Sequence, residues 1–242
     1  MGDGSDNAPS FETDTIGVWW VDLDAPAPAN DVLLDLLDDH ERQRARRFRK
    51  TEHQDAYVRS HAALRQILGA RLDCRPEDIH LAHPDGGKPF VQRPADQATL
   101  DFSLSHADNI ALVAVSARGR IGVDVERTAP PDSLAIARRW FAEDEIAWLE
   151  PLSEPERSAS FLACWTAKEA HLKALGLGLS GDLRACRCRL TAGDDVVPEV
   201  MDERDAIDHR WRLVPLTRGE AVGCLAIQDN EAEPDISVFA WS

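Results

Sequence analysis

The chain has little positive charge for its size, and its first forty residues contain no lysine or arginine. Among its 242 residues, 43 aspartates and glutamates outnumber 27 lysines and arginines, which gives a formal net charge of -16. Proteins that bind nucleic acid generally neutralise its phosphates with basic side chains. The charge balance therefore argues against general nucleic-acid binding.

The sequence also lacks long apolar runs and paired cysteines. The apolar stretch at residues 110–115 is far shorter than the roughly 20 residues that a membrane span needs. Nothing in the first thirty residues has the basic and apolar pattern of a secretory or transit peptide. Of the five cysteines only Cys186 and Cys188 lie close together, so neither a disulfide framework nor structural zinc is indicated. We expect a cytoplasmic protein that does not enter the membrane.

The length lies between that of one large domain and two small ones. The apolar pattern predicts a disordered leader (1–12), an N-terminal subdomain (13–118) and a C-terminal subdomain (119–242). Residues 45–48 (Ala-Arg-Arg-Phe) have a counterpart at residues 137–141, which favours an internal duplication. Expected strands are residues 16–21, 98–104, 110–117, 121–125, 185–190, 211–215, 221–227 and 236–241, and expected helices are residues 31–39, 41–68, 133–152 and 154–175.

Two carboxylates lie on one face of the expected strand Gly-Val-Asp-Val-Glu. Its period of two places Val123 and Val125 on one side, and Asp124 and Glu126 on the other. The two carboxylates are thus aimed at one point. An acidic strand face turned to solvent would have the same pattern.

The helix around Trp-Thr-Ala-Lys-Glu-Ala carries charges along an apolar stripe. Lys168 lies within the stripe, and Glu169 lies at its edge, one turn before Lys173. Burial of an unpaired charge costs several kcal/mol, so these groups need a metal, a phosphate or each other. The alternative is an ordinary ion pair on the helix surface.

Two further segments carry groups that suit phosphate oxygens. Lys88 follows a glycine turn and precedes Pro89, which restricts the backbone and would hold the side chain in place. Ser105 and His106 end an expected strand, where hydroxyl and imidazole donors often meet a ligand. A solvated loop is the alternative for Lys88, and no G-x-S-x-G motif marks Ser105 as a nucleophile.

Basic residues are concentrated between positions 42 and 50, which hold five arginines and one lysine. Such a run is usually a solvated helix face. In so acidic a chain it is also the natural site for an anionic ligand or partner.

Taken together, G-K-P (87–89), F-S-L-S-H (102–106), G-V-D-V-E (122–126) and W-T-A-K-E-A (165–170) with Lys173 resemble the 4′-phosphopantetheinyl transferases. The order and spacing match the single-chain, surfactin-synthetase-activating type. The resemblance implies an α/β (α+β) pseudo-dimer. Each of its two similar subdomains would pack helices on a small, mainly antiparallel sheet, with coenzyme A bound between them.

The resemblance also implies roles for particular residues. The magnesium ligands would be Asp124, Glu126 and Glu169, with Mn²⁺ as a substitute ion, and Glu169 and Lys173 would be catalytic. The contacts with coenzyme A would come from Arg44, Gly87, Lys88, Pro89, Ser105, His106 and Lys173. Phe141 and Glu145 match a family segment to which no role is assigned.

The implied reaction transfers the phosphopantetheine arm of coenzyme A to a serine of an apo acyl or peptidyl carrier protein, with release of adenosine 3′,5′-bisphosphate. Such an enzyme would serve fatty acid, polyketide or nonribosomal peptide biosynthesis, and its single-chain cleft implies a monomer. Two alternatives remain open: a metal-dependent phosphodiesterase or nucleotide hydrolase, and a non-catalytic module that binds coenzyme A or a carrier. The chain departs from the family pattern at Glu41, where relatives often have a lysine, and at Ala107, where they commonly have a serine.

Overall fold

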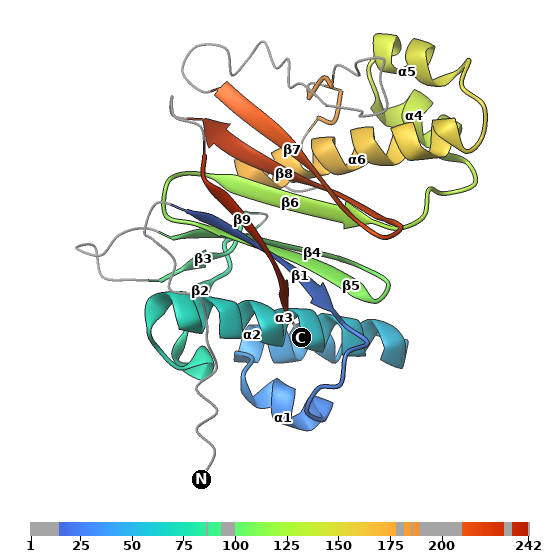
Figure 1. Ribbon diagram of the computed structural model, residues 1–242. Helices are drawn as coiled ribbons and strands as arrows, with labels where there is room; N and C mark the ends of the chain where they lie inside the picture. Colours follow the sequence, from blue (N-terminus) through green and yellow to red (C-terminus); the bar gives the residue numbers. More distant parts are fainter. Residues whose placement is uncertain are drawn as a thin grey trace.

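The computed structural model describes residues 15–85, 87–92, 100–177, 182–184, 186–188, 210–229 and 234–241. Its architecture is two sheets packed face to face, with helices covering the outer face of each (Figure 1). The first sheet has the order β4-β5-β1-β9 and the second the order β6-β8-β7. This arrangement confirms the predicted α+β class with two helix-on-sheet halves.

The first half contains the long helix of the N-terminal region. Its elements are β1 (Ile16–Asp22), α1 (Asn30–Asp35), α2 (Asp39–Ala45), α3 (Thr51–Leu72), the short β2 (Leu81–Ala82) and β3 (Phe90–Val91), β4 (Asp101–Ala107) and β5 (Ile110–Ser116). One apolar core joins α3 to this sheet through Leu64, Leu68, Trp19 and Val113. Burial of these side chains fixes α3 across the sheet.

The second half repeats this plan. It contains β6 (Ile121–Glu126), α4 (Ser133–Trp140), α5 (Glu143–Leu149), α6 (Glu156–Leu175), β7 (Arg210–Arg218) and β8 (Ala221–Asp229). A second apolar core lies between α6 and its sheet, and the rings of Phe141 and Phe161 stack in it with centroids 5.4 Å apart. A third core, which includes Trp20, Leu112, Val123 and Leu225, joins the two sheets.

The strands β4 and β6 meet where the two halves join. Ser103 Oγ accepts a hydrogen bond from the Val123 amide at 3.0 Å, and Asp101 Oδ2 accepts one from the Ile121 amide at 2.8 Å. On the other side of β6, the backbone of α6 comes very close to Gly122, because a Cβ there would lie 2.0 Å from the carbonyl oxygen of Ala170. These contacts hold β4, β6 and α6 at fixed positions relative to one another.

Two expected helices are each interrupted. The predicted helix 41–68 is wrong as one element, because α2 ends at Ala45 and Lys50, at the start of α3, has an extended backbone. The predicted helix 133–152 is divided into α4 and α5 by Phe141, which is extended so that its ring enters the core. In both places the apolar residues keep a helical spacing in the sequence although the helix itself is interrupted. The interruption follows from tertiary packing, which the spacing does not show.

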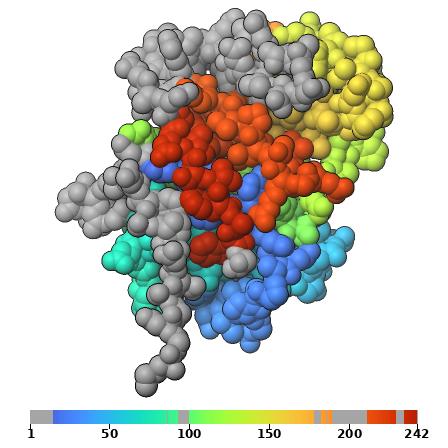
Figure 2. All heavy atoms as spheres, in the orientation of Figure 1, coloured from blue at the N-terminus to red at the C-terminus, as the bar shows by residue number. Residues whose placement is uncertain are grey.

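The last strand does not belong to the half in which the sequence predicts it. The strand β9 (Ile236–Trp241) pairs in parallel with β1 of the first sheet, with Val18 opposite Val238. It crosses the middle of the face in Figure 2, beside the blue N-terminal residues. The strand β9 follows the predicted C-terminal subdomain (119–242) in sequence, but it pairs within the sheet of the first half and covers the edge of β1.

Four other expectations concern the leader, one strand, membrane spans and the cysteines. The leader (1–12) lies outside the described residues, as does much of the expected strand 185–190. None of the described helices is long and apolar enough to cross a membrane. Four of the five cysteines are buried, and all five are free thiols.

Candidate functional site

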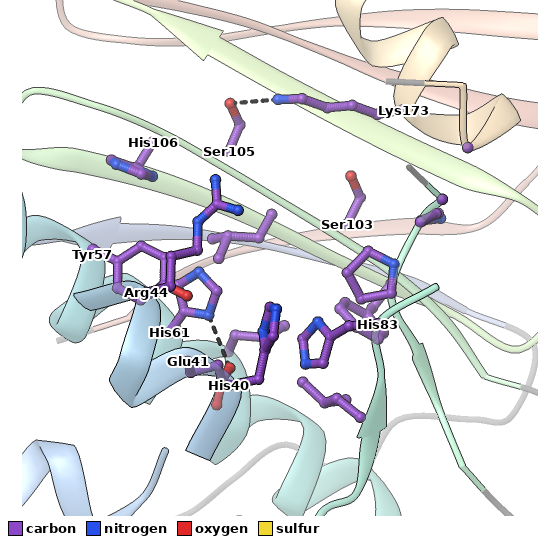
Figure 3. A pocket seen from close by; sticks show the side chains of 18 of the residues that line it. His40, Glu41, Arg44, Tyr57, His61, His83, Ser103, Ser105, His106 and Lys173 are labelled. Atoms are coloured by element: carbon purple, nitrogen blue, oxygen red, sulfur yellow. Dashed lines mark hydrogen bonds and ion pairs between the residues drawn. The ribbon is translucent and has the colours of Figure 1, made fainter. Parts of the chain in front are cut away.

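A cleft of about 670 Å³ lies between α2, α3, β4 and the end of α6. Figure 3 shows Arg44, Tyr57 and His61 on one side of it, and Ser105 and Lys173 on the other. Its volume suits a small molecule of the size of a nucleotide cofactor. All of the predicted coenzyme A contacts line it: Arg44, Gly87, Lys88, Pro89, Ser105, His106 and Lys173.

Lys173, Asp124 and Ser105 form a closed set of hydrogen bonds at the junction of the two halves. The ammonium of Lys173 donates to Asp124 Oδ1 at 2.6 Å and to Ser105 Oγ at 2.8 Å. The Ser105 hydroxyl donates to the same Asp124 oxygen at 2.8 Å. The three side chains come from α6, β6 and β4, so the contact between these elements assembles the site.

Two further carboxylates lie near this set of hydrogen bonds. Glu126 follows Asp124 on the same face of β6, and Glu169 lies one turn before Lys173 on α6. Burial and the negative charge of Asp124 raise the pKa of Glu126 to about 7. The same two causes raise the pKa of Glu169. The three predicted metal ligands are therefore close enough to repel one another.

This carboxylate group fits a hard divalent cation. Asp124 Oδ2 and Glu169 Oε1 are buried and have no hydrogen-bond partner among the described residues. Buried carboxylate oxygens normally have partners, and oxygen ligands are those that Mg²⁺ prefers. The ligand oxygens of Asp124, Glu126 and Glu169 do not all lie within 4.8 Å of one another. A cation would have to draw them together against their mutual repulsion.

Lys88 has a different environment from the one its sequence predicts. Its ammonium does not extend from a turn into solvent, because it donates to Asp101 Oδ2 at 2.5 Å and to the carbonyl of Ile121 at 2.7 Å. Since Asp101 also accepts the amide of Ile121, Lys88 ties β4 to the start of β6. The solvated loop lysine therefore does not describe this position, and the predicted contact with a phosphate stays a prediction for a side chain that lines the cleft.

His106 lies near the end of β4 and lines the cleft together with Arg44 and Lys173. Partial burial lowers its pKa, and the positive charges of His61 and Lys173 lower it further, to about 4. Its imidazole is therefore neutral near pH 7 and offers one N–H donor.

Glu41 does not reach into the cleft as a free charge. Its carboxylate is buried, with Oε2 2.6 Å from Arg65 Nε and Oε1 2.9 Å from His61 Nδ1. Burial alone would raise the pKa of Glu41, but His61 and Arg65 lower it below its ordinary value. The change from the family pattern is thus accommodated by local ion pairs. Sequence reasoning missed Tyr57, His61 and His83 in the cleft wall, because their shared position depends on helix packing.

Two family matches together cover most of the chain. Residues 26–118 match the family "4′-phosphopantetheinyl transferase, N-terminal", and residues 120–226 match the "4′-phosphopantetheinyl transferase superfamily". The boundary between them falls between β5 and β6, where the two halves meet. The chain belongs to the 4′-phosphopantetheinyl transferase family.

Individual members of this family have similar sequences. The 4′-phosphopantetheinyl transferase HetI of Nostoc is 34% identical over 69% of this chain and 71% of its own. A putative 4′-phosphopantetheinyl transferase of Synechocystis is 37% identical, and the match covers 61% of this chain but only 60% of that protein. Sfp of Bacillus subtilis is 27% identical over 72% of this chain and 75% of its own. The predicted family is confirmed, and it favours a transferase over a hydrolase or a binding module.

Among solved structures, the holo-[acyl-carrier-protein] synthase of Neisseria meningitidis aligns with 46% of this chain and 98% of its own. The TM-score of this alignment is 0.35, and the sequence identity is 19%.

Proposed function

We propose that this 4′-phosphopantetheinyl transferase moves the phosphopantetheine arm of coenzyme A to a serine of an apo carrier protein, and releases adenosine 3′,5′-bisphosphate. The observation that carries the proposal is the grouping of Lys173 with two carboxylates, Asp124 and Glu169, each of which has one buried oxygen without a hydrogen-bond partner in the described part of the chain. A phosphoryl transfer needs such a centre, because charge on the pyrophosphate must be neutralised as the bond breaks.

The ion that suits this centre is Mg²⁺, with Mn²⁺ as a substitute. Asp124, Glu126 and Glu169 would hold it, since they are the carboxylates that converge on the Lys173 side of the cleft. When bound, a divalent ion neutralises the pyrophosphate and polarises the attacked phosphorus.

The remaining steps depend on side chains of this chain. Lys173 stabilises negative charge on the phosphates, and it is already placed by its bonds to Asp124 and Ser105. Glu169 accepts the proton of the carrier serine, a role that its raised pKa suits because a base needs some affinity for the proton. His106 donates to a phosphate oxygen in its neutral form.

The cleft binds coenzyme A between Arg44 on α2 and Lys173 on α6. No hydrogen bond or ion pair to another described side chain occupies the Arg44 guanidinium, so it is free to pair with a phosphate. The loop at Gly87 and Pro89 contacts coenzyme A through its backbone. The Lys88 ammonium binds a phosphate of coenzyme A only after it gives up its present partners. One chain supplies all of the residues that line the cleft, which supports an enzyme that acts as a monomer.

The direct test is mass spectrometry of an apo acyl or peptidyl carrier protein incubated with this chain, coenzyme A and Mg²⁺. A mass gain of one phosphopantetheine arm on the carrier, with stoichiometric adenosine 3′,5′-bisphosphate, is the expected result. Release of the nucleotide without a carrier would instead identify a hydrolase. Binding of coenzyme A without release of product would identify a binding module.

A further inference from the structure

A second group of ligand-type side chains lies at the far edge of the cleft, away from Lys173. It consists of Asp38, His40 and His83, and their ligand atoms all lie within 4.8 Å of one another. Among the described residues, no other three histidine, cysteine, aspartate or glutamate side chains bring their ligand atoms within this distance of one another. Figure 3 shows the rings of His40 and His83 facing each other beside Glu41. Their centroids are 3.9 Å apart.

The carboxylate of the group is held rigidly. Asp38 caps α2, and its Oδ1 accepts the amide of Glu41 at 2.8 Å, while Glu41 Oε2 accepts the amide of Asp38 at 2.9 Å. The other oxygen, Oδ2, accepts from Arg65 Nη2 at 2.8 Å. A carboxylate oxygen has a second lone pair, so this contact leaves Oδ2 able to bind an ion. Hydrogen bonds of this kind commonly support carboxylates that bind metals.

The imidazoles supply two further ligand atoms. His83 Nε2 is buried, has no hydrogen-bond partner among the residues that the structure describes, and lies 3.5 Å from Asp38 Oδ2. Two ligands of a tetrahedral ion, with bonds of about 2.0 Å, lie about 3.3 Å apart, so these two atoms are already at nearly the required separation. His40 is exposed on the second position of α2, and its ring can rotate to supply the third ligand.

The donor set identifies the kind of ion. Two imidazole nitrogens and one carboxylate suit Zn²⁺ and related transition metals, whereas Mg²⁺ prefers oxygen ligands. The positive charge of Arg65 does not prevent a cation from binding, because the two negative charges of Asp38 and Glu41 exceed it. We propose that Asp38, His40 and His83 form a Zn²⁺ site, separate from the carboxylates around Asp124. Both imidazoles line the cleft, so the fourth position of the ion is open to a ligand there.

The site is tested by zinc binding to the full chain, without any measure of transfer activity. After removal of metals, the chain competes with a chromogenic chelator for Zn²⁺ in excess Mg²⁺. We expect one equivalent of Zn²⁺ with a dissociation constant of about 1 µM or tighter. His40→Gln and His83→Gln should each weaken this binding by about tenfold or more, since even outer partners of a metal site have effects of that size.

The matched control is His80→Gln, because His80 is an exposed histidine three residues from His83 that lies outside the group. It should bind Zn²⁺ as the unchanged chain does. Thermal unfolding of each variant shows whether the fold is kept, and the visible spectrum of bound Co²⁺ reports four-coordinate ligation in the unchanged chain. Absence of a tight equivalent, a loss equal to that in His80→Gln, or binding that survives both substitutions in the group would overturn the proposal.

Discussion

The ammonium of Lys168 lies 2.9 Å from Glu145 Oε1, and both side chains are almost wholly buried. Burial alone would lower the pKa of Lys168, but the acidic groups around it, Cys188 and Glu145 foremost, raise it. Lys168 also donates to the carbonyls of Leu183 and Cys186. These contacts fix α6 from the side opposite the cleft, so that its next residue, Glu169, faces the proposed centre. The pair thus gives Glu145 a structural role.

Lys168→Met should lower the free energy of unfolding by about 3–5 kcal/mol, because Glu145 is left as a buried charge without its cation. Urea denaturation followed by circular dichroism measures this loss. The matched control is Arg138→Met, which breaks the exposed ion pair with Glu150 and should cost less than about 1 kcal/mol. Similar losses in the two variants would show that the buried pair contributes no more than a surface one.

Gly122→Ala should reduce both stability and turnover. The new Cβ would lie 2.0 Å from the carbonyl oxygen of Ala170 and 2.5 Å from the amide nitrogen of Ala174, so β6 must move away from α6. We expect a loss of about 1–3 kcal/mol from overpacking. Turnover should fall by about a hundredfold, because this contact sets the position of Asp124 relative to Glu169 and Lys173.

The control for this change is Gly219→Ala. Gly219 has a φ of +60°, and a Cβ there would meet nothing within 4 Å. The variant should lose about 1–2 kcal/mol through its backbone alone and keep its turnover. Full activity in Gly122→Ala would contradict this prediction, because it would show that β6 can move away from α6 without loss of turnover.

Local periodicity predicted the parts of this site that lie along single elements. The alternation in β6 places Asp124 and Glu126 on one face, and the helical period of α6 places Glu169 one turn before Lys173. Both predictions depended only on the spacing of residues that are close together in the sequence. The transferase family followed from the order of such segments.

Contacts between distant segments could not be predicted in this way. Nothing near Glu41 in the sequence indicates that Arg65 and His61 would bury it. The parallel pairing of Val18 with Val238 joins opposite ends of the chain, and apolar alternation alone is compatible with either sheet. For the same reason the sequence did not show that Lys88 would bond to Asp101.

Asp124→Asn and Glu169→Gln should each lower turnover by about a hundredfold or more, since several kcal/mol of charge stabilisation or proton transfer would be lost. Both changes keep the side-chain shape, and both residues have a buried oxygen without a partner within the described ranges. The fold should therefore survive, with cooperative thermal unfolding. Assays of transfer from coenzyme A across a Mg²⁺ titration measure the effect. Unfolded variants would show instead that the carboxylates are structural.

Glu41→Gln should make stability less dependent on acid pH. The pKa of Glu41 in the folded chain lies below its ordinary value of 4.5, so ionised Glu41 stabilises the fold above that pH. This contribution is lost as the pH falls below 4.5. The variant should therefore be less stable than the unchanged chain at pH 7, and the difference should shrink in acid. Urea unfolding across this range measures it, with Glu52→Gln at an exposed position as the control.

Arg44→Ala tests whether the basic run 42–50 recognises coenzyme A or the carrier. Arg44 lines the cleft, and its positive charge acts on both Tyr57 and His106. A charge-assisted bond to the 3′-phosphate of coenzyme A contributes about 1.5–3 kcal/mol. The variant should then lose about 10 to 150 fold in kcat/KM with coenzyme A and little with 3′-dephospho-coenzyme A.

The same assay with Arg46→Ala supplies the comparison, because Arg46 is exposed at the end of α2 and does not line the cleft. If the run docks an acidic carrier instead, Arg44→Ala and Arg46→Ala should lose activity equally with both donors. The KM for the carrier should then rise, more steeply at low salt, because screening weakens surface attraction. The position of Arg44 inside the cleft, opposite Lys173, favours the 3′-phosphate, and retained discrimination between the two donors by Arg44→Ala would exclude it.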